Sequence, residues 1–419
     1  MKYKLALFGG QKTILPEKAR FNWPVITDEV EAVVMKQLHE SVSIYNRSGI
    51  FEEFENNFAD YHGRKKGLLF NSGTSAIYSM FEGIGLGPGD EVICPTYTLF
   101  ATVSPMMMTG ARPVFCDCRE DGNINPDEIV KKITAKTKAV IVTHMWGIPC
   151  QMDVISEICS QHKLALLEDC SHAHGASYQG RKVGTFGSAA AWSLQGQKII
   201  SGGEGGIMLT DTDSIYNRAL LLGHYNKRCK QEIPESFQLS GFSQTGFGQK
   251  FRAHPLAIAM ANQQFSHLDE WVCQKSQFAK QYIAELGSCR FLTMPQFHDS
   301  QPSWYAFVMQ YNEASANGVK IEKFVEALQA EGLSEVDMPG STCPIHNLPL
   351  FVAPEQVFPR LYENKQTNIS DFPIAEKFYN LAIKIPVWAF PQDAEVVVAY
   401  IKGFQKVISV VENEPKTLT

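Results

Sequence analysis

Residues 189–206 read AAAWSLQGQKIISGGEGG, and the rest of the chain is interpreted outward from this stretch. An apolar run of strand length leads into a polar turn, one lysine and a glycine-dense return. We expect this tight turn to hold Lys198 close to the backbone. Burial disfavours an ammonium ion, and a neutral lysine is the nucleophile that forms Schiff bases with carbonyl compounds. The pattern therefore indicates pyridoxal phosphate chemistry, whereas the alternative is a solvated surface lysine, which is far commoner.

Upstream of this stretch, segments of strand length alternate with segments of helix length. The expected strands are 67–70, 91–94, 113–116, 139–143 and 164–167. Helices are expected over 28–41, 48–62, from the turn at 71–75 to 82, and over 96–109, 127–133 and 153–162. Such alternation predicts an α/β fold with a parallel sheet covered by helices on both faces.

Downstream, the pattern continues and then changes. We expect a strand at 207–210, a helix at 213–222, a mobile lid or subunit-contact loop at 226–244, and a helix from 256 toward Trp271. Proline, glycine and polar residues interrupt the pattern at 286–303, which places a domain boundary there. The prediction is a large domain with an N-terminal arm, 1–285, and a small α/β domain, 286–419, with a strand at 306–310 and helices at 321–331 and 394–411.

The amino-acid composition indicates which classes of binding partner to expect. The 419 residues include 38 basic and 44 acidic side chains, so nucleic acid and anionic membranes are not expected to bind. No apolar run reaches transmembrane length, and residues 1–10 contain too short an apolar core for a signal peptide. Ten scattered cysteines without a Cys-x-x-Cys pair indicate reduced thiols in a cytoplasmic protein.

A phosphate site is expected where the first strand meets its helix. Ligands of such sheets bind beyond the carboxyl ends of the strands. Segment 71–75 lies at one of these ends, so its N–H groups and the hydroxyls of Thr74 and Ser75 are placed to bind a phosphate. The alternative is an ordinary helix cap.

Two other strand ends carry ionisable groups. Glu168 and Asp169 follow an apolar run, and a carboxylate there can keep a pyridine nitrogen protonated. The alternative is a cap for the residues that follow. His144 also ends a strand, either beside a substrate or as a hydrogen-bonded core histidine.

Together these segments resemble the sugar aminotransferases of the DegT/DnrJ/EryC1/StrS family, which are fold-type I pyridoxal phosphate enzymes. The resemblance extends over essentially the whole chain, because the family landmarks occur in order at 71–76, 95–98, 110–115, 168–176, 193–198 and 203–206. It implies a large domain with a mostly parallel seven-stranded sheet and a smaller C-terminal α/β domain.

The resemblance also implies catalytic roles. Lys198 would carry the cofactor as a Schiff base and, once released, would shuttle protons. Asp169 would pair with the pyridinium nitrogen, and His172 would lie near the ring hydroxyl.

The phosphate would be held by Gly73, Thr74 and Ser193. Lys250 would reach this phosphate from a second subunit. The resemblance therefore implies a cytoplasmic homodimer with shared active sites.

Two positions depart from the commonest family pattern. Leu99 stands where an aromatic residue usually covers the cofactor ring, so stacking is aliphatic or comes from Phe100. Gln195 stands where many nucleotide-sugar enzymes have histidine; together with residues 5–10 it favours the branch that aminates keto-cyclitols. His346 matches a segment that borders the acceptor pocket.

The leading hypothesis is an aminotransferase that moves an amino group from L-glutamate or L-glutamine to a keto-sugar or keto-cyclitol, with pyridoxal phosphate and no metal. One alternative is another reaction on the same fold. Related deoxy-sugar dehydratases carry histidine in place of the lysine, so Lys198 argues against that branch, while an aromatising enzyme that makes aminohydroxybenzoate stays open. A non-catalytic regulator is a third hypothesis, although no helix-turn-helix segment supports DNA binding.

Overall fold

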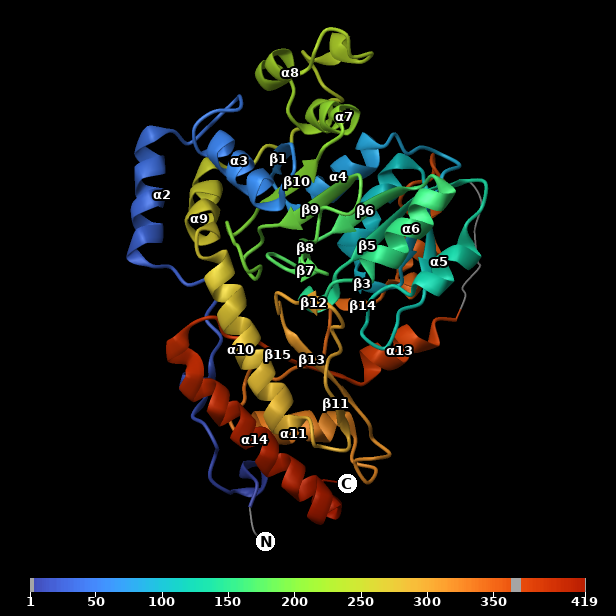
Figure 1. Cartoon of the computed structure of the whole chain (residues 1–419). Coiled ribbons are helices and arrows are strands. Elements are labelled where there is room, and N and C mark those ends of the chain that lie inside the picture. The colour runs from blue at the N-terminus through green and yellow to red at the C-terminus, as the bar shows by residue number, and fades with distance from the viewer. Residues whose placement is uncertain (1–3, 363–370, 419) are drawn as a thin grey trace.

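A seven-stranded sheet forms the centre of the molecule (Figure 1). The computed structural model describes residues 4–362 and 371–418. The first three residues of segment 1–10, for which no signal peptide is expected, lie outside these ranges. The strand order is β1-β10-β9-β6-β5-β2-β4. The strands are β1 (Lys66–Phe70), β2 (Glu91–Pro95), β4 (Arg112–Cys116), β5 (Thr137–Thr143), β6 (Ala165–Asp169), β9 (Ala189–Ser193) and β10 (Gly206–Thr210).

Most neighbouring strands run parallel. Strands β4, β2, β5, β6 and β9 are parallel, and β10 is antiparallel to both β9 and β1. Strand β1 therefore points the same way as β9, and its carboxyl end lies at the same edge of the sheet. The predicted α/β fold with a mostly parallel sheet is confirmed.

Both faces of the sheet are covered, as alternate residues of β5 show. Ile141 belongs to a core shared with α4 (Gly73–Gly83) and α7 (Asp213–Gly223). Val140 and Val142 belong to a second core. That core contains residues of α5 (Pro126–Lys132) and α6 (Met152–His162). Successive side chains of a strand point to opposite faces, so the continuous apolar run in β5 reflects burial on both sides.

The C-terminal part forms a second layer around its own sheet, in the order β11-β13-β15. Its strands are β11 (Leu292–Thr293), β13 (Phe307–Tyr311) and β15 (Ala382–Ile385), and its main helices are α10 (Leu268–Leu286), α11 (Ile321–Ala330) and α14 (Ala394–Asn413). Leu5 and Ala19 join this core with Phe278 and Tyr282 of α10. In Figure 1 the N-terminal segment accordingly lies beside the C-terminal helices. The boundary between 285 and 286 stays a prediction.

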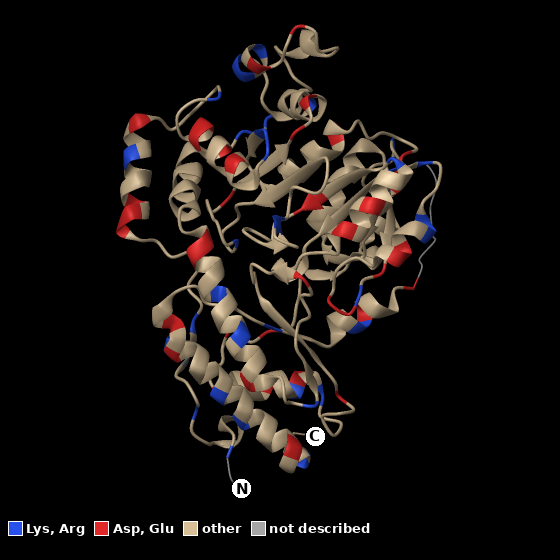
Figure 2. Ribbon diagram, in the orientation of Figure 1, with Lys and Arg blue, Asp and Glu red and all other residues tan. Residues whose placement is uncertain are grey.

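The remaining elements are short or peripheral. They are α1 (Pro16–Ala19), α2 (Asp28–Glu40), α3 (Ile50–His62), α8 (Lys227–Glu232), α9 (Pro255–Phe265), α12 (Pro349–Val352), α13 (Pro373–Asn380), β3 (Tyr97–Leu99), β7 (Ser177–Tyr178), β8 (Arg181–Lys182), β12 (Ser300–Gln301) and β14 (Thr342–Pro344). Figure 2 shows acidic and basic residues interspersed along the helices. None of the helices in the described ranges is long and apolar enough to cross a membrane.

The prediction of a helix over 96–109 is wrong. The segment instead contains β3, which pairs with the distant strand β14, and two 3-10 helices, Phe100–Thr102 and Ser104–Thr109. Strand pairing with residues 342–344 is a tertiary contact, which overrides local helical spacing. Pro105 also lacks the N–H that a continuous helix would use.

Two further expectations need correction. Segment 226–244 is not simply an open loop, because it contains α8. Arg228 of that helix is buried and donates hydrogen bonds of 2.8 and 2.7 Å to the Glu55 carboxylate. The helix expected from 256 to Trp271 is two helices, since α9 ends at Phe265 and α10 begins at Leu268.

Candidate active site

Three strand ends meet at one edge of the central sheet. Strand β6 ends at Asp169, β9 ends at Ser193, and β1 leads through Ser72 into α4. A cavity of about 290 Å³ lies beyond them. Its lining residues come from both layers: Ser72, Gly73, Thr74, Ile77, Leu99, Ala101, Thr102, Thr143, Asp169, Ser171, His172, Ser193, Gln195, Gln197, Lys198, Glu204, Tyr305, Ser341 and Thr342.

Lys198 is buried in the wall of this cavity, with 6% of its surface exposed. Its N–H donates to the Gln195 carbonyl at 2.8 Å, which closes the turn after β9. Its carbonyl accepts a 2.7 Å hydrogen bond from Nε1 of Trp23 in the N-terminal arm. Burial lowers the pKa of Lys198 to about 8, although the nearby Asp169 carboxylate opposes the shift. A substantial fraction of the amine is therefore neutral near physiological pH, as a nucleophile requires.

Asp169 and Glu168 face opposite sides of β6, and only Asp169 lines the cavity. The Thr102 hydroxyl donates to Asp169 Oδ2 at 2.7 Å, and the Ser171 N–H donates to Oδ1 at 3.0 Å. Both carboxylate oxygens are thereby fixed in position. Glu168 accepts three backbone N–H groups at 2.6–2.8 Å, from residues 184, 186 and 187. It therefore holds the 184–187 turn against the sheet.

His144 does not line the cavity. Its Nδ1 accepts from the Cys150 N–H at 3.1 Å, so Nε2 carries the proton and faces Glu168 at 3.4 Å. Burial acts to raise the pKa of Glu168, but the hydrogen bonds from His144 and the backbone outweigh it and lower the pKa. Donor atoms of His144, Glu168 and Cys170 lie within 4.8 Å of one another. Because the histidine and carboxylate are already hydrogen-bonded, this cluster is a structural network.

Two stacked rings, those of His172 and Tyr305, line the cavity. The rings of His172 and Tyr305 are 4.0 Å apart and nearly parallel, at 10°. The Trp146 ring lies beside this pair, with its centroid 5.6 Å from His172 and 6.3 Å from Tyr305, and the Lys198 Nζ lies 4.6 Å from the Tyr305 ring centroid. Burial, and secondarily the charge of Lys198, holds the pKa of His172 well below its usual value. The imidazole is therefore neutral, and its Nδ1 has no hydrogen-bond partner among the described residues.

The N-terminus of α4 forms another wall. Ser72 caps the helix by accepting from the Ser75 N–H at 3.1 Å. A Cβ at Gly73 would lie only 2.6 Å from the Ser193 Cβ, so glycine is required for this close approach. Gly73, Thr74 and Ser193 all line the cavity, whereas the Ser75 hydroxyl donates to Asn71 Oδ1 at 2.6 Å and does not. The orphan N–H groups of the first helical turn suit an anion such as phosphate.

Of the other predicted site residues, some line the cavity and others do not. Leu99 and Gln195 line the cavity. Phe100 is exposed, and Lys250 is also exposed and lies outside this cavity. His346 is buried and hydrogen-bonds through Nδ1 to the Thr96 hydroxyl at 2.9 Å, so the structure does not bring it to the cavity either.

The model of the DegT/DnrJ/EryC1/StrS aminotransferase family matches residues 26–402. The chain belongs to this family. It is therefore an aminotransferase. A spore coat polysaccharide biosynthesis protein, SpsC, from Bacillus subtilis is 30% identical over 82% of this chain and 86% of the relative.

Two further comparisons agree with this assignment. A Micromonospora echinospora protein named as an L-glutamine:3-amino-2,3-dideoxy-scyllo-inosose aminotransferase is 30% identical over 93% of this chain and 92% of its own. The solved structure of an aminotransferase from Psychrobacter cryohalolentis superimposes with a TM-score of 0.81 at 23% identity, covering 94% of this chain and all of that one. Both the fold and the family thus extend over nearly the whole chain.

Several residues that line or support this cavity could not be assigned to it from the sequence. Thr102 lies in a segment that was expected to be helical, and Tyr305 follows the segment interpreted as a domain boundary. Trp23, which holds the Lys198 carbonyl, lies 175 residues away in the sequence. The aromatic residues of the arm around 21–24 were a visible signal, but no local pattern assigns them a partner.

Proposed function

We propose that this aminotransferase uses pyridoxal phosphate to move an amino group from L-glutamate or L-glutamine to a keto-sugar or keto-cyclitol. The observation that carries the proposal is one cavity that contains a buried lysine of lowered pKa, a fixed carboxylate and a helix N-terminus. These three groups match the aldehyde, the ring nitrogen and the phosphate of the cofactor.

The chemistry of the lining residues fits that cofactor. Lys198 supplies the amine for the aldehyde, Asp169 supplies the anion for a protonated ring nitrogen, and His172 has an unpartnered Nδ1 for a polar substituent. Gly73, Thr74 and Ser193 provide the phosphate end, with Leu99 and Gln195 as further walls. When bound, pyridoxal phosphate acts as an electron sink for carbanion chemistry.

The protein side of the reaction follows from these positions. The Lys198 amine, once free, would serve as the base that moves a proton, because burial lowers its pKa to about 8. Asp169 would keep a positive ring nitrogen charged, and the hydrogen bonds from Thr102 and Ser171 hold the carboxylate in one orientation. Burial keeps both Lys198 and His172 largely out of bulk solvent.

The donor and acceptor classes rest on the relatives and on Gln195. The Micromonospora relative is named for L-glutamine and an amino-bearing keto-cyclitol. A Streptomyces kanamyceticus relative, 31% identical over 66% of this chain and 66% of its own, is named as an L-glutamine:2-deoxy-scyllo-inosose aminotransferase. Gln195, which lines the cavity where nucleotide-sugar members often have histidine, supports the cyclitol branch.

We also propose a homodimer in the cytoplasm. Lys250 is exposed and lies outside the cavity of its own chain, which is consistent with a role in the cavity of a partner subunit. Phe100 and Met108 are large exposed apolar residues, as are Met35 and Leu38 on α2. If these side chains form continuous patches, association with a second copy would cover them.

Absorption spectroscopy of the protein loaded with pyridoxal phosphate tests the proposal. Addition of L-glutamate or L-glutamine should convert the lysine-linked form of the cofactor to pyridoxamine phosphate, with release of the keto acid. Lys198→Ala is the matched control and should not convert. Conversion by neither donor would contradict the proposal and would direct attention to the aromatising reaction.

A further inference from the structure

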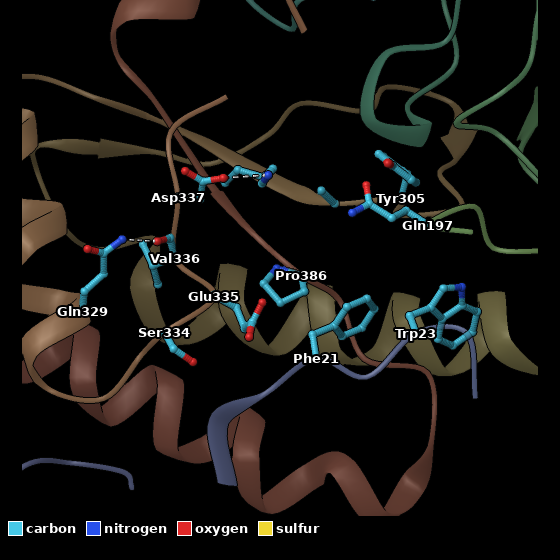
Figure 3. Close-up of a pocket in the computed structure, with 12 residues that line it drawn as sticks. Phe21, Trp23, Gln197, Tyr305, Gln329, Ser334, Glu335, Val336, Asp337 and Pro386 are labelled. Atoms are coloured by element: carbon cyan, nitrogen blue, oxygen red, sulfur yellow. Dashed lines mark hydrogen bonds and ion pairs between the residues drawn. The ribbon is translucent and has the colours of Figure 1, made fainter. Parts of the chain in front are cut away.

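A second cavity, of about 480 Å³, lies between the N-terminal arm and the C-terminal layer. Figure 3 shows Tyr305 and Gln197 together at one end and Gln329 and Ser334 at the other. Phe21 and Trp23 line it from the arm, while the segment 334–337 lines it from the C-terminal layer. Its volume is within the range of about 300–1,000 Å³ that is common for small-molecule sites.

This second cavity adjoins the lysine cavity. Tyr305 and Gln197 line both cavities. The Tyr305 ring centroid lies 4.6 Å from the Lys198 Nζ, and the same residue lines the second cavity. A ligand whose ketone reaches Lys198 can therefore extend past Tyr305 and Gln197.

The polar groups of the second cavity are mostly anions or neutral acceptors. Lys384 is its one cationic lining residue among those described, and it already pairs with Asp337 at 3.0 Å. Gln329 donates to the Val336 carbonyl at 2.8 Å. Glu335 is half-buried, and Figure 3 draws no hydrogen bond or ion pair between its carboxylate and the other lining residues shown. Within the described ranges, the Asp337 carboxylate has an ion-pair partner and the Glu335 carboxylate has none.

Aromatic rings complete the pattern. Phe21, Trp23 and Tyr305 line the same cavity as Glu335, and each ring already lies near an amine, Lys275 Nζ for Phe21 and Trp23 and Lys198 Nζ for Tyr305. An ammonium group is attracted both by a carboxylate and by the faces of aromatic rings. A diphosphate, in contrast, would meet an unpaired carboxylate and no free cation, which is electrostatically unfavourable.

We propose that this second cavity is a specificity site for the part of the acceptor remote from the ketone, and that it selects a polyhydroxylated ring bearing an amine over a nucleoside diphosphate. The inference rests on the proposed function and narrows its acceptor. Glu335 binds the ammonium, and the hydroxyl and amide groups of Ser334 and Gln329 bind ring hydroxyls. Tyr305 and Gln197 separate the amine-binding part from the reacting carbon.

Transamination run in reverse tests this assignment with available amines. The amine of the probe becomes a ketone while pyridoxal phosphate becomes pyridoxamine phosphate, so loss of the cofactor's visible absorbance reports the reaction. The probes are streptamine, a diamino-cyclitol; scyllo-inosamine, which has one amine and otherwise hydroxyls; and a thymidine-diphosphate amino sugar. The expected order of kcat/KM is streptamine, then scyllo-inosamine, then the nucleotide sugar.

The Glu335→Gln variant separates binding from chemistry. Its KM for streptamine should rise about tenfold, the loss expected for one hydrogen bond between charged groups, with little change in kcat. Its KM for scyllo-inosamine and its reaction with the amino-acid donor should stay as in the parent. Glu322→Gln, an exposed position on α11 outside both cavities, is the matched control. Calorimetric titration of streptamine into the Lys198→Ala protein, with and without Glu335→Gln, measures the same difference without turnover.

The outcomes distinguish this inference from the proposed function. Suppose that the amino-acid donor reacts. The proposed specificity site is then wrong if streptamine does not react, if the nucleotide sugar is preferred, or if Glu335→Gln leaves both the KM and the affinity for streptamine unchanged. In each of these cases the proposed aminotransferase function stands. If neither donor nor probe reacts, the proposed function falls, and the specificity site falls with it.

Discussion

The hydroxyl of Thr102 donates a 2.7 Å hydrogen bond to Asp169, the carboxylate that lies in the same cavity as Lys198. Thr102 belongs to a short 3-10 helix, and Asp169 ends β6, so this contact joins two separate elements at the floor of the site. With the Ser171 N–H on the other oxygen, the carboxylate is held in one orientation. Two hydrogen bonds from the protein thus set the direction of this carboxylate.

Asp169→Asn should slow the reaction with the amino-acid donor by about 10²- to 10³-fold, the size typical of removing one preorganised electrostatic group. The amide preserves an oxygen for Thr102 but loses the negative charge. Stopped-flow absorbance under single-turnover conditions measures the rate.

Glu168→Gln is the control on the neighbouring residue. Its side chain holds backbone N–H groups away from the cavity, so the substitution should lower the free energy of unfolding by about 1–3 kcal/mol. The donor reaction of the folded variant should change little. A loss of rate equal to that of Asp169→Asn would contradict the separate roles of these two carboxylates.

Gly73→Ala should weaken binding of pyridoxal phosphate by about tenfold or more, because a close van der Waals overlap forces the α4 N-terminus away from Ser193. Gly87→Ala is the matched control, since nothing lies within 4 Å of a Cβ there. Fluorescence titration gives both dissociation constants. Equal affinities in the two variants would show that α4 and Ser193 do not form the phosphate end together.

The association of pyridoxal phosphate with the cofactor-free protein should accelerate as pH rises, with a midpoint near the Lys198 pKa of about 8. Only the neutral amine attacks the aldehyde, and its fraction grows as pH passes the pKa. Rates measured from pH 6 to pH 10 in constant ionic strength test this. A midpoint close to the ordinary lysine value would mean that Lys198 is not the nucleophile.

The protonation of Lys275 provides a test of how the N-terminal arm packs against the rest of the protein. It is buried beneath Phe21 and Trp23, its Nζ lying 5.6 and 5.3 Å from their ring centroids, and it donates to the Val387 carbonyl. Burial lowers its pKa from 10.5 to about 7, with partial opposition from Asp393. The unfolded chain therefore binds more protons between these two pH values, and stability contributed by this residue rises with pH across that window.

Lys275→Met should remove this dependence. Between pH 7 and pH 9 its free energy of unfolding should rise less steeply than that of the parent, by roughly 1 kcal/mol per pH unit. Urea unfolding at several pH values measures both slopes, and the comparison cancels the other titrating groups. Parallel slopes would show that Lys275 stays charged in the folded protein.

Much of the large domain could be predicted from local pattern. The strand ends that carry Asp169, Ser193 and the turn at 71–75 were placed correctly, because continuous apolar runs mark buried parallel strands. The burial of Lys198 in a turn was predictable because a glycine-dense segment follows an apolar strand, and the structure shows that burial. These signals are local in sequence, so composition and periodicity contain them.

Contacts between distant segments were not accessible in the same way. Tyr305 reaches His172, and Trp23 reaches Lys198, only after the C-terminal layer and the arm pack against the large domain. The β3–β14 pairing likewise depends on residues some 240 positions apart, so local helical spacing at 96–109 was misleading. His144 was ambiguous because a histidine at a strand end can serve either the core or the site, and its contacts with Cys150 and Glu168 place it in the core.

Reduction of the cofactor-loaded protein with borohydride, followed by proteolysis and mass spectrometry, tests the central claim most directly. Reduction converts the Schiff base to a stable secondary amine. The lysine that bound the cofactor therefore carries the added mass of the reduced cofactor. We predict a single labelled peptide containing Lys198, and no label on Lys250 or on the Lys198→Ala variant. A label on another lysine, or none at all, would contradict the account of this site.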